Sequence, residues 1–346
     1  MHELFPDGID SPPGMSKLNQ GAVLNNLALA YAKIGQSRRA ISLLKRAIIT
    51  NKDLKKQFAN LPDFQRFSQD QIALGFENLS LRHLELGDLK SAYDSLEQSK
   101  KLYNKVKNTY GIAAIHQLLG QLFSYLGQFK KAERYVQQSI AYCKSKNELR
   151  DYCIDLETLA RMSLLEGDPM RAFRYAEEMR EKLEELEETQ KFEEGIVRAE
   201  WLLGAAKLLL YGPDTAAHHL EEALTRCRRI NLVELEARIL LEHAKLALTQ
   251  ASSNVTDAEA VSFRQEAEQL AMDALRIADR CEYRLKQAEI HNFLAKLFLN
   301  IGDLPKARDN AEIATERASC GVDPLTSSYY YKPAYEEASR ILQECG

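Results

Sequence analysis

Small residues that recur at a fixed distance are the feature that most limits what this chain can fold into. Five pairs of alanine or glycine are each separated by 12 residues: Ala28 and Ala40, Gly120 and Ala132, Ala160 and Ala172, Gly204 and Ala216, and Ala295 and Ala307. Small residues recur where two helices cross closely, because a larger side chain there would force the backbones apart. The interval therefore predicts a pair of helices that the chain repeats.

Glycine recurs where the first helix of such a pair must turn into the second. It occupies this position in five units: Gly35, Gly87, Gly127, Gly167 and Gly302. Glycine adopts the left-handed backbone conformation that ends a helix without a clash of its Cβ. Asp88, Asp168 and Asp303 directly follow three of these glycines and are predicted to cap the next helix.

The order leucine, small residue, aromatic residue, glycine, alanine, apolar residue and small residue resembles the tetratricopeptide repeat, from about Lys17 to Gly321. This resemblance implies an all-α fold, a right-handed solenoid of about seven helix pairs. Some repeats are longer than the usual length of about 34 residues, since 40 residues separate Gly120 from Ala160 and 44 separate Ala160 from Gly204. The extended repeats and the C-terminal part are similar to the sensor regions of bacterial STAND-type NTPases. The C-terminal part is also similar to repeat proteins linked to caspase-like proteases.

The expected organisation has three parts. Residues 1–15 contain three prolines and no helical period, so they are expected to form a disordered tail or linker. Residues 16–321 form the repeat array, with an inserted helix and loop at 53–70 and a further insertion at 251–263. Residues 322–346 are expected to form a linker and a capping helix, which would cover the apolar face of the last repeat.

Composition narrows the function classes. With 45% apolar and 28% charged residues, the 346-residue chain reads as a folded, water-soluble protein. A formal net charge of -4 gives no reason to expect a nucleic-acid partner, and no apolar run is long enough to predict a membrane span. The six cysteines are scattered, with no CxxC spacing and no signal peptide before them, which predicts reduced thiols in a cytoplasmic protein.

Catalytic and metal-binding motifs are not found in the sequence. The nearest approach to a metal site is the His218–His219 pair, in which His218 and Glu222 would share a helix face but supply only two ligands. We therefore expect no enzymatic activity, no metal and no cofactor.

The expected function is that of a non-catalytic scaffold that binds a protein or peptide segment in the concave groove of the array. This expectation follows from the resemblance, because the first helix of each pair lines the concave wall in such arrays. The side chains predicted to point into the groove are Asn25, Lys33, Asn78, Gln117, Gln121, Tyr125, Arg161, Arg198, Trp201, Arg238, Lys245, Asn292 and Lys296.

The predicted groove becomes basic toward its middle. Arg161, Arg198 and Arg238 could hold carboxylates through paired hydrogen bonds, which favours a partner with an acidic segment. The alternative for each arginine is a salt bridge at the rim to a nearby glutamate, Glu157, Glu200 or Glu242. Trp201 is expected either to anchor a partner side chain or to pack between helices.

Three alternatives remain: a sensor or regulatory arm, a nucleic-acid-binding helical repeat, and a helical-toroid enzyme with a closed acidic or metal-lined pocket. The chain could be the sensor or regulatory arm of an effector, an NTPase or a caspase-like protease in bacterial signalling or defence, and that effector would then be its partner. The acidic run at 177–195 is interpreted as a solvated outer face, with a docking surface for a basic partner as the alternative.

Overall fold

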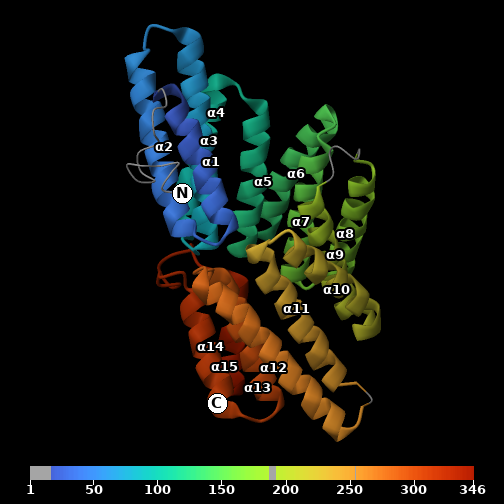
Figure 1. Ribbon diagram of the computed structural model, residues 1–346. Coiled ribbons are helices and arrows are strands. Elements are labelled where there is room, and N and C mark those ends of the chain that lie inside the picture. Colours follow the sequence, from blue (N-terminus) through green and yellow to red (C-terminus); the bar gives the residue numbers. More distant parts are fainter. Residues whose placement is uncertain (1–16, 187–191, 254) are drawn as a thin grey trace. The chain divides into compact units, whose positions relative to one another are not determined.

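The structure is a computed structural model that describes residues 17–186, 192–253 and 255–346. These residues form fifteen α-helices and no strand (Figure 1), which confirms the predicted all-α class. The tail expected at 1–15 lies outside the described residues. The chain divides into two compact units, Met1–Leu119 and Gly120–Gly346, here called unit 1 and unit 2.

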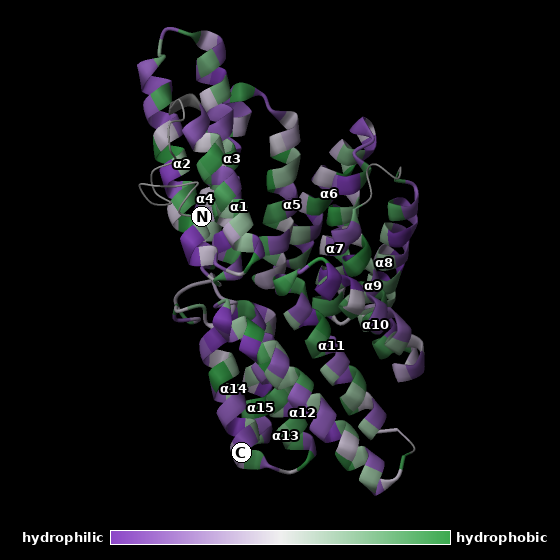
Figure 2. Ribbon diagram, in the orientation of Figure 1, coloured by the Kyte–Doolittle hydropathy of each residue, from purple (hydrophilic) through white to green (hydrophobic). Residues whose placement is uncertain are grey.

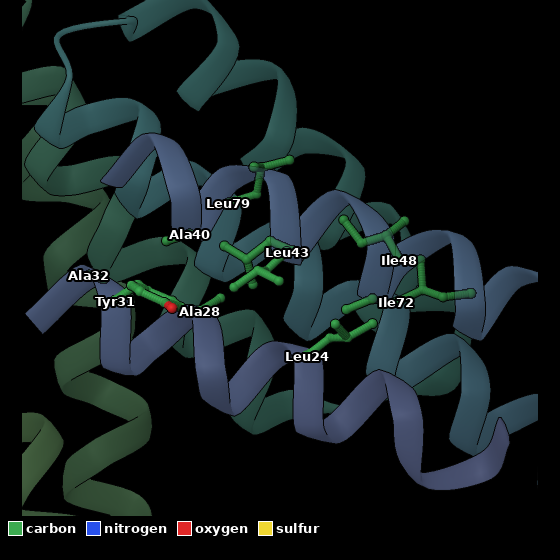
Figure 3. Close-up of a cluster of buried hydrophobic side chains, with 11 residues drawn as sticks. Leu24, Ala28, Tyr31, Ala32, Ala40, Leu43, Ile48, Ile72 and Leu79 are labelled. Carbon is green, nitrogen blue, oxygen red and sulfur yellow. The ribbon is translucent and has the colours of Figure 1, made fainter. Parts of the chain in front are cut away.

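Unit 1 contains two helix pairs and the beginning of a fifth helix that continues into unit 2. Its helices are α1 (Lys17–Lys33), α2 (Ser37–Gln57), α3 (Pro62–Glu85), α4 (Leu89–Val106) and the first part of α5 (Thr109–Tyr125). The core is a cluster of buried apolar side chains from α1, α2 and α3 (Figure 3). Leu24 and Ala28 of α1 lie in this cluster with Leu44 of α2 and Ile72 of α3.

The segment 53–70 differs from the inserted helix and loop expected there. Its first residues continue α2 to Gln57, a short turn follows, and the remainder belongs to α3 from Pro62 onward. Leu54 is buried, so the added turn of α2 still contributes to the core. The extra residues thus lengthen two helices of the array and form no separate element.

Unit 2 contains the end of α5 and ten further helices. They are α6 (Phe129–Lys146), α7 (Leu149–Glu166), α8 (Pro169–Glu184), α9 (Glu193–Tyr211), α10 (Pro213–Arg229), α11 (Val233–Ala251), α12 (Asp257–Arg280), α13 (Arg284–Asn300), α14 (Leu304–Ala318) and α15 (Lys332–Glu344). Over the described residues of both units, the helices form seven successive pairs followed by one terminal helix, as the spacing of small residues predicts.

The small residues lie where paired helices cross. A Cβ atom added to Gly204 of α9 would lie 2.6 Å from Leu220 Cγ of α10 and 3.3 Å from the Leu220 backbone nitrogen. Ala172 and Ala216, the second members of two of the pairs, are fully buried. The helices of a pair are therefore close enough that one methyl group would separate them.

The turns follow the predicted chemistry, as the α7–α8 connection illustrates. Gly167 has a φ of 78°, the left-handed conformation that ends α7. The next residue, Asp168, caps α8 by accepting a hydrogen bond of 3.0 Å from the Arg171 backbone N–H. Asp88 and Asp303 cap α4 and α14 in the same way.

Each helix carries both hydrophobic and hydrophilic residues (Figure 2), and the hydrophobic ones pack against neighbouring helices. In unit 2, α7 contacts α9, α9 contacts α11, α11 contacts α13, and α13 contacts α15, in addition to contacts between helices consecutive in sequence. The first helices of successive pairs therefore share one surface. We call the surface formed by α7, α9, α11 and α13 the inner face of unit 2.

The terminal helix α15 packs as the first helix of a further pair would, against α14 and α13. Its buried residues Ala334, Ala338 and Ile341 lie on one side, and Ile341 joins a small cluster with Ala295 and Ala311. This is the position expected for a capping helix. Within the described part of the chain, no helix is both long and apolar enough to cross a membrane.

Candidate functional site: a charged network on the inner face of unit 2

Three successive helices of the inner face carry the same pair of charged residues. A glutamate is followed four residues later by an arginine in α7, α9 and α11: Glu157 and Arg161, Glu194 and Arg198, and Glu234 and Arg238. Residues four apart lie on the same side of a helix. Because α9 contacts both α7 and α11, the pattern brings carboxylates and guanidinium groups from three repeats together.

Arg198 lies at the centre of this network and binds carboxylates from three helices. Its guanidinium group donates to Glu157 Oε1 at 2.7 Å, to Glu194 Oε1 at 2.8 Å and to Glu234 Oε2 at 3.4 Å. Burial opposes its charge, but Glu157, Glu234 and Glu194 outweigh that effect and hold the pKa of Arg198 well above its usual value. Arg198 therefore links α7, α9 and α11 as a permanent cation.

Glu234 extends the network to the next repeat. The ammonium group of Lys286 on α13 donates to Glu234 Oε1 at 2.7 Å. Burial alone would raise the pKa of Glu234, but Lys286, Arg198 and Arg238 lower it well below its usual value. Its carboxylate is thus held by cations from α9, α11 and α13.

A second centre forms around Tyr125, near the end of α5. Its hydroxyl oxygen accepts hydrogen bonds from the guanidinium groups of Arg161 and Arg238, the latter at 3.2 Å. Burial disfavours ionisation of this phenol, but the two guanidinium groups outweigh it and lower the pKa of Tyr125. Arg238 also lies 3.9 Å from the Glu289 carboxylate and faces the ring of Trp201. Residues 113 positions apart in sequence therefore meet at one hydroxyl group.

The residue before α15 completes this second centre. The hydroxyl group of Tyr331 donates to Glu289 Oε1 at 2.7 Å, and the Tyr331 ring meets the Tyr125 ring edge to face, with 5.1 Å between ring centres. Only 1% of Tyr331 is exposed. The C-terminal segment thus contacts the inner face directly.

Charges within the network are balanced. Four cations, Arg161, Arg198, Arg238 and Lys286, stand beside four carboxylates, Glu157, Glu194, Glu234 and Glu289. Such a surface carries little net charge and presents directed hydrogen-bond donors and acceptors.

Five of the predicted groove residues converge in this network: Tyr125, Arg161, Arg198, Trp201 and Arg238. Trp201 is 4% exposed, so its ring packs between helices in this structure. Lys245 of α11 pairs with Glu242 at 2.8 Å. Gln121 of α5 is half-buried.

Two further predicted groove residues contact the chain's own terminal helix. The side-chain amide of Asn292 donates to the Ala334 carbonyl at 2.8 Å, and Lys296 forms an ion pair with Glu337. Both partners lie in α15. At α13, therefore, the positions that were predicted to face a partner are occupied by residues 331–337.

The remaining predicted residues belong to unit 1. Asn25 and Asn78 are buried and hydrogen-bonded to each other, with 2.9 Å between Asn78 Nδ2 and Asn25 Oδ1. Lys33 is exposed at the end of α1, and Gln117 is half-buried on α5. The two asparagines satisfy one another and so contribute to the packing of α1 against α3.

Sequence reasoning named Glu157 as a partner of the arginines, but it did not name Glu194, Glu234 or Glu289 and did not place Tyr331 beside the arginines. Glu157 was considered as a rim partner of an arginine, but the structure places it 5% exposed and bonded to Arg198. Glu242 pairs with a lysine, and Glu200 bonds to His219 at 2.6 Å. The repeated spacing of glutamate and arginine was the available signal for the network.

Two other features singled out in the sequence have ordinary structural roles. His219 lies between Glu200 and Lys207, whose ammonium nitrogen is 2.9 Å from His219 Nε2. Throughout the residues described here, no group of three or more histidine, cysteine, aspartate or glutamate side chains could hold a metal ion. The acidic run at 177–195 lies partly outside the described residues. In its first part, Met179 and Leu183 are buried on one side of α8.

Comparisons with known proteins agree with this architecture. Residues 23–57 and 71–145 match the family described as "Tetratricopeptide repeat". A comparison with curated protein sequences finds no significant match. Solved structures share the fold.

One similar structure is the Rap conjugation gene regulator of the plasmid pLS20 in complex with the Phr* peptide, with 13% identity, a TM-score of 0.66 and coverage of 96% of this chain and 80% of that chain. A second is a Rap protein complexed with competence and sporulation factor, with 12% identity, a TM-score of 0.53 and coverage of 94% and 97%. A third is a STAND protein with a tetratricopeptide repeat sensor from Pyrococcus horikoshii, with 13% identity, a TM-score of 0.45 and coverage of 96% and 53%.

Proposed function

We propose, from the match of residues 23–57 and 71–145 to the tetratricopeptide repeat, that this chain is a non-catalytic interaction scaffold whose unit 2 binds a peptide segment of a partner. The observation that carries the proposal is that Arg161, Arg198 and Arg238 converge on one surface. They come from α7, α9 and α11. Apolar residues would hold the helices together at least as well, because buried ion pairs pay a desolvation cost. A surface that keeps these charges is therefore suited to recognition.

The partner segment in this proposal carries acidic side chains. Arg198 already holds three carboxylates, and those of Glu194 and Glu234 are 33% and 30% exposed, against 6% for Glu157. The bond from Arg198 to Glu234, at 3.4 Å, is the longest of the three. A carboxylate of the partner could exchange with one of these exposed glutamates, because it would offer the same two oxygens to the guanidinium group.

Two lysines at the edge of the network add further cationic groups. The side chains of Lys245 and Lys296 are 43% and 51% exposed, and each is paired with a single glutamate of the same chain. Exposed ion pairs of this kind contribute little to stability. Both ammonium groups are therefore available to a second acidic residue of the partner.

The fold comparisons support a peptide as the class of ligand, since one Rap structure is a complex with the Phr* peptide and the other a complex with competence and sporulation factor. The non-catalytic part of the proposal is supported by the mutual pairing of the charged groups on the inner face. A cytoplasmic location belongs to the same proposal and rests on the six free cysteines.

The test is a selection of displayed peptides against the full chain, followed by affinity measurements with charge-reversal variants. The double variant Lys245→Glu, Lys296→Glu is expected to weaken the selected peptides by about tenfold or more, since two charge-assisted contacts become repulsive. Lys130→Glu, an exposed lysine of α6, is the matched control and should leave affinity unchanged. Equal binding by all three proteins would show that the inner face of unit 2 is not the binding surface.

A further inference from the structure

The segment that leads into α15 is held by the inner face as a peptide ligand would be. Tyr331 donates its hydroxyl proton to Glu289 of α13 at 2.7 Å, and Asn292, one turn further along α13, donates to the Ala334 carbonyl at 2.8 Å. The Tyr331 backbone N–H donates to the Ala318 carbonyl at 2.8 Å. One side-chain contact and two backbone contacts thus fix residues 331–334.

The Tyr331 ring also contacts the charged network, through Tyr125. It packs edge to face on Tyr125, whose hydroxyl oxygen binds Arg161 and Arg238. The next residue, Lys332, lies against the turn after α5, where a Cβ added to Gly127 would come within 3.0 Å of Lys332 Cδ. The end of α5 and the inner helices therefore enclose the Tyr331 side chain almost completely.

A capping role does not explain these polar contacts. Ala334, Ala338 and Ile341 already bury the apolar side of α15. A tyrosine hydroxyl at a 1% exposed position is tolerated only because Glu289 accepts its proton, and Glu289 in turn faces Arg238. This chain of partners recognises a hydroxyl group specifically.

Asn292 gives an independent indication that a ligand could be held better than the present segment. Its Nδ2 donates to Ala334, but its Oδ1 is buried and has no hydrogen-bond partner. A buried acceptor without a donor is costly. A ligand that offered both a carbonyl oxygen and an N–H group here would bind Asn292 Nδ2 and Asn292 Oδ1 at the same time.

We propose that Tyr331 fills a tyrosine-binding subsite on the inner face of unit 2, and that a tyrosine of a partner peptide takes its place when residues 331–346 detach. The ligand is an unmodified tyrosine, because phenylalanine lacks the proton that Glu289 accepts and phosphotyrosine would bring negative charge to that carboxylate. This inference rests on the proposed function, since it requires that the inner face bind a peptide.

Beyond the contacts of Tyr331 and Ala334 described above, and those of Arg308 with the Cys345 and Gly346 carbonyls, α15 is held by few strong interactions. The helix is 13 residues long and buries three apolar side chains of small or moderate size. Its ion pair between Glu337 and Lys296 is exposed, so it contributes little to holding the helix.

The probe is a labelled synthetic peptide with the sequence of residues 327–337, SSYYYKPAYEE. Its affinity is measured for the full wild-type chain and for the full-length variant Tyr331→Ala, in which the subsite is vacated. We expect the variant to bind the probe at least about tenfold more tightly, because the wild-type chain occupies its own site. A probe carrying Tyr331→Phe should bind the same variant about tenfold or more weakly, which is the usual effect of losing a hydrogen bond to a charged group.

The control is Tyr330→Ala. Tyr330 packs against Tyr335 and no hydrogen bond from it to Glu289 is seen in the described contacts, so this variant should bind the probe no better than the wild type. Adding Glu289→Gln to Tyr331→Ala should reduce the preference for tyrosine over phenylalanine, because the neutral amide oxygen is a weaker acceptor than the carboxylate. A Tyr331→Ala chain that keeps its helical signal and cooperative unfolding but fails to bind the probe, or binds both probes equally, would overturn the inference.

If Tyr331→Ala does not fold, the variant Tyr331→Phe takes its place, because it keeps the ring and removes only the bond to Glu289. It should bind the tyrosine probe more tightly than the wild type does, and equal binding would overturn the inference. The outcomes separate the two proposals. If the chain binds tyrosine and phenylalanine probes equally but Lys245→Glu, Lys296→Glu still weakens peptide binding, only the tyrosine subsite is contradicted. If Lys245→Glu, Lys296→Glu leaves peptide affinity unchanged, the proposed function is contradicted.

Discussion

Asp155 of α7 gives the sharpest prediction about stability. Its side chain is completely buried, its Oδ1 has no hydrogen-bond partner, and its Oδ2 accepts a weak hydrogen bond from the Cys143 thiol at 3.6 Å. Burial raises the pKa of Asp155 to about 8. At neutral pH the folded chain therefore holds this carboxyl group in its protonated form.

The sign of the pH dependence follows from the unfolded state. An unfolded aspartate loses its proton near a pKa of about 3.9, so between about pH 4 and pH 8 the folded chain binds one proton more than the unfolded chain. The free energy of unfolding then falls as pH rises, by about 1.4 kcal/mol per pH unit. Between pH 5 and pH 7.5 the loss amounts to about 3 kcal/mol, and above the folded pKa the dependence ends.

The perturbation is Asp155→Asn, which has nearly the same shape and does not titrate. The amide adds donors with no partner, at a cost of about 1–3 kcal/mol, but that cost is the same at both pH values and cancels when they are compared. The gain of the variant over the wild type should therefore be about 3 kcal/mol larger at pH 7.5 than at pH 5.

Urea unfolding followed by circular dichroism at the two pH values measures this difference. Asp151→Asn, on the same helix and only partly buried, is the matched control for the general loss of a carboxylate. If the effect of Asp155→Asn were the same at pH 5 and pH 7.5, the carboxyl group would not be protonated in the folded chain and the reasoning would fail.

Two further predictions concern the caps and the crossings of the helices. Asp88 caps α4, and its hydrogen bond with His83 lowers the pKa of Asp88 to about 2. Asp88→Ala should therefore lower the free energy of unfolding by about 1 kcal/mol at pH 7. This effect should disappear as the pH falls from about 4 to 2, because the wild-type carboxylate is then protonated. Equal effects at pH 2 and pH 7 in urea unfolding would contradict this. Gly204→Ala places a methyl group against Leu220 and should cost about 1–3 kcal/mol; a thermal midpoint at or above that of the wild type would refute the close crossing.

The helix pairs and their turns could be predicted because the signals are local. Ala160 and Ala172 are the two small residues at which α7 and α8 cross, and a single turn separates them. Within that turn, Gly167 ends α7 and Asp168 caps α8. None of these inferences required knowledge of distant parts of the chain. The segment 53–70 was harder to interpret, because an added turn of α2 and an inserted helix have the same local pattern.

The candidate site could be predicted only in part. The sequence placed Arg161, Arg198 and Arg238 on one surface, since their positions follow from the repeat, and the structure brings them together. It gave no means of choosing their partners. Arg198 binds Glu157 across 41 positions, whereas Glu200, two residues away from Arg198, turns to His219.

The sequence by itself determined the class of the fold, the number of helix pairs and the chemistry of the turns, because each depends on residues within one repeat. Only the tertiary structure decided that the arginines are balanced by carboxylates and that Tyr331 occupies the inner face beside Tyr125. These contacts join residues from different repeats. Their geometry depends on how successive helix pairs stack, and small differences in that stacking accumulate over several repeats before Tyr125 meets Arg238.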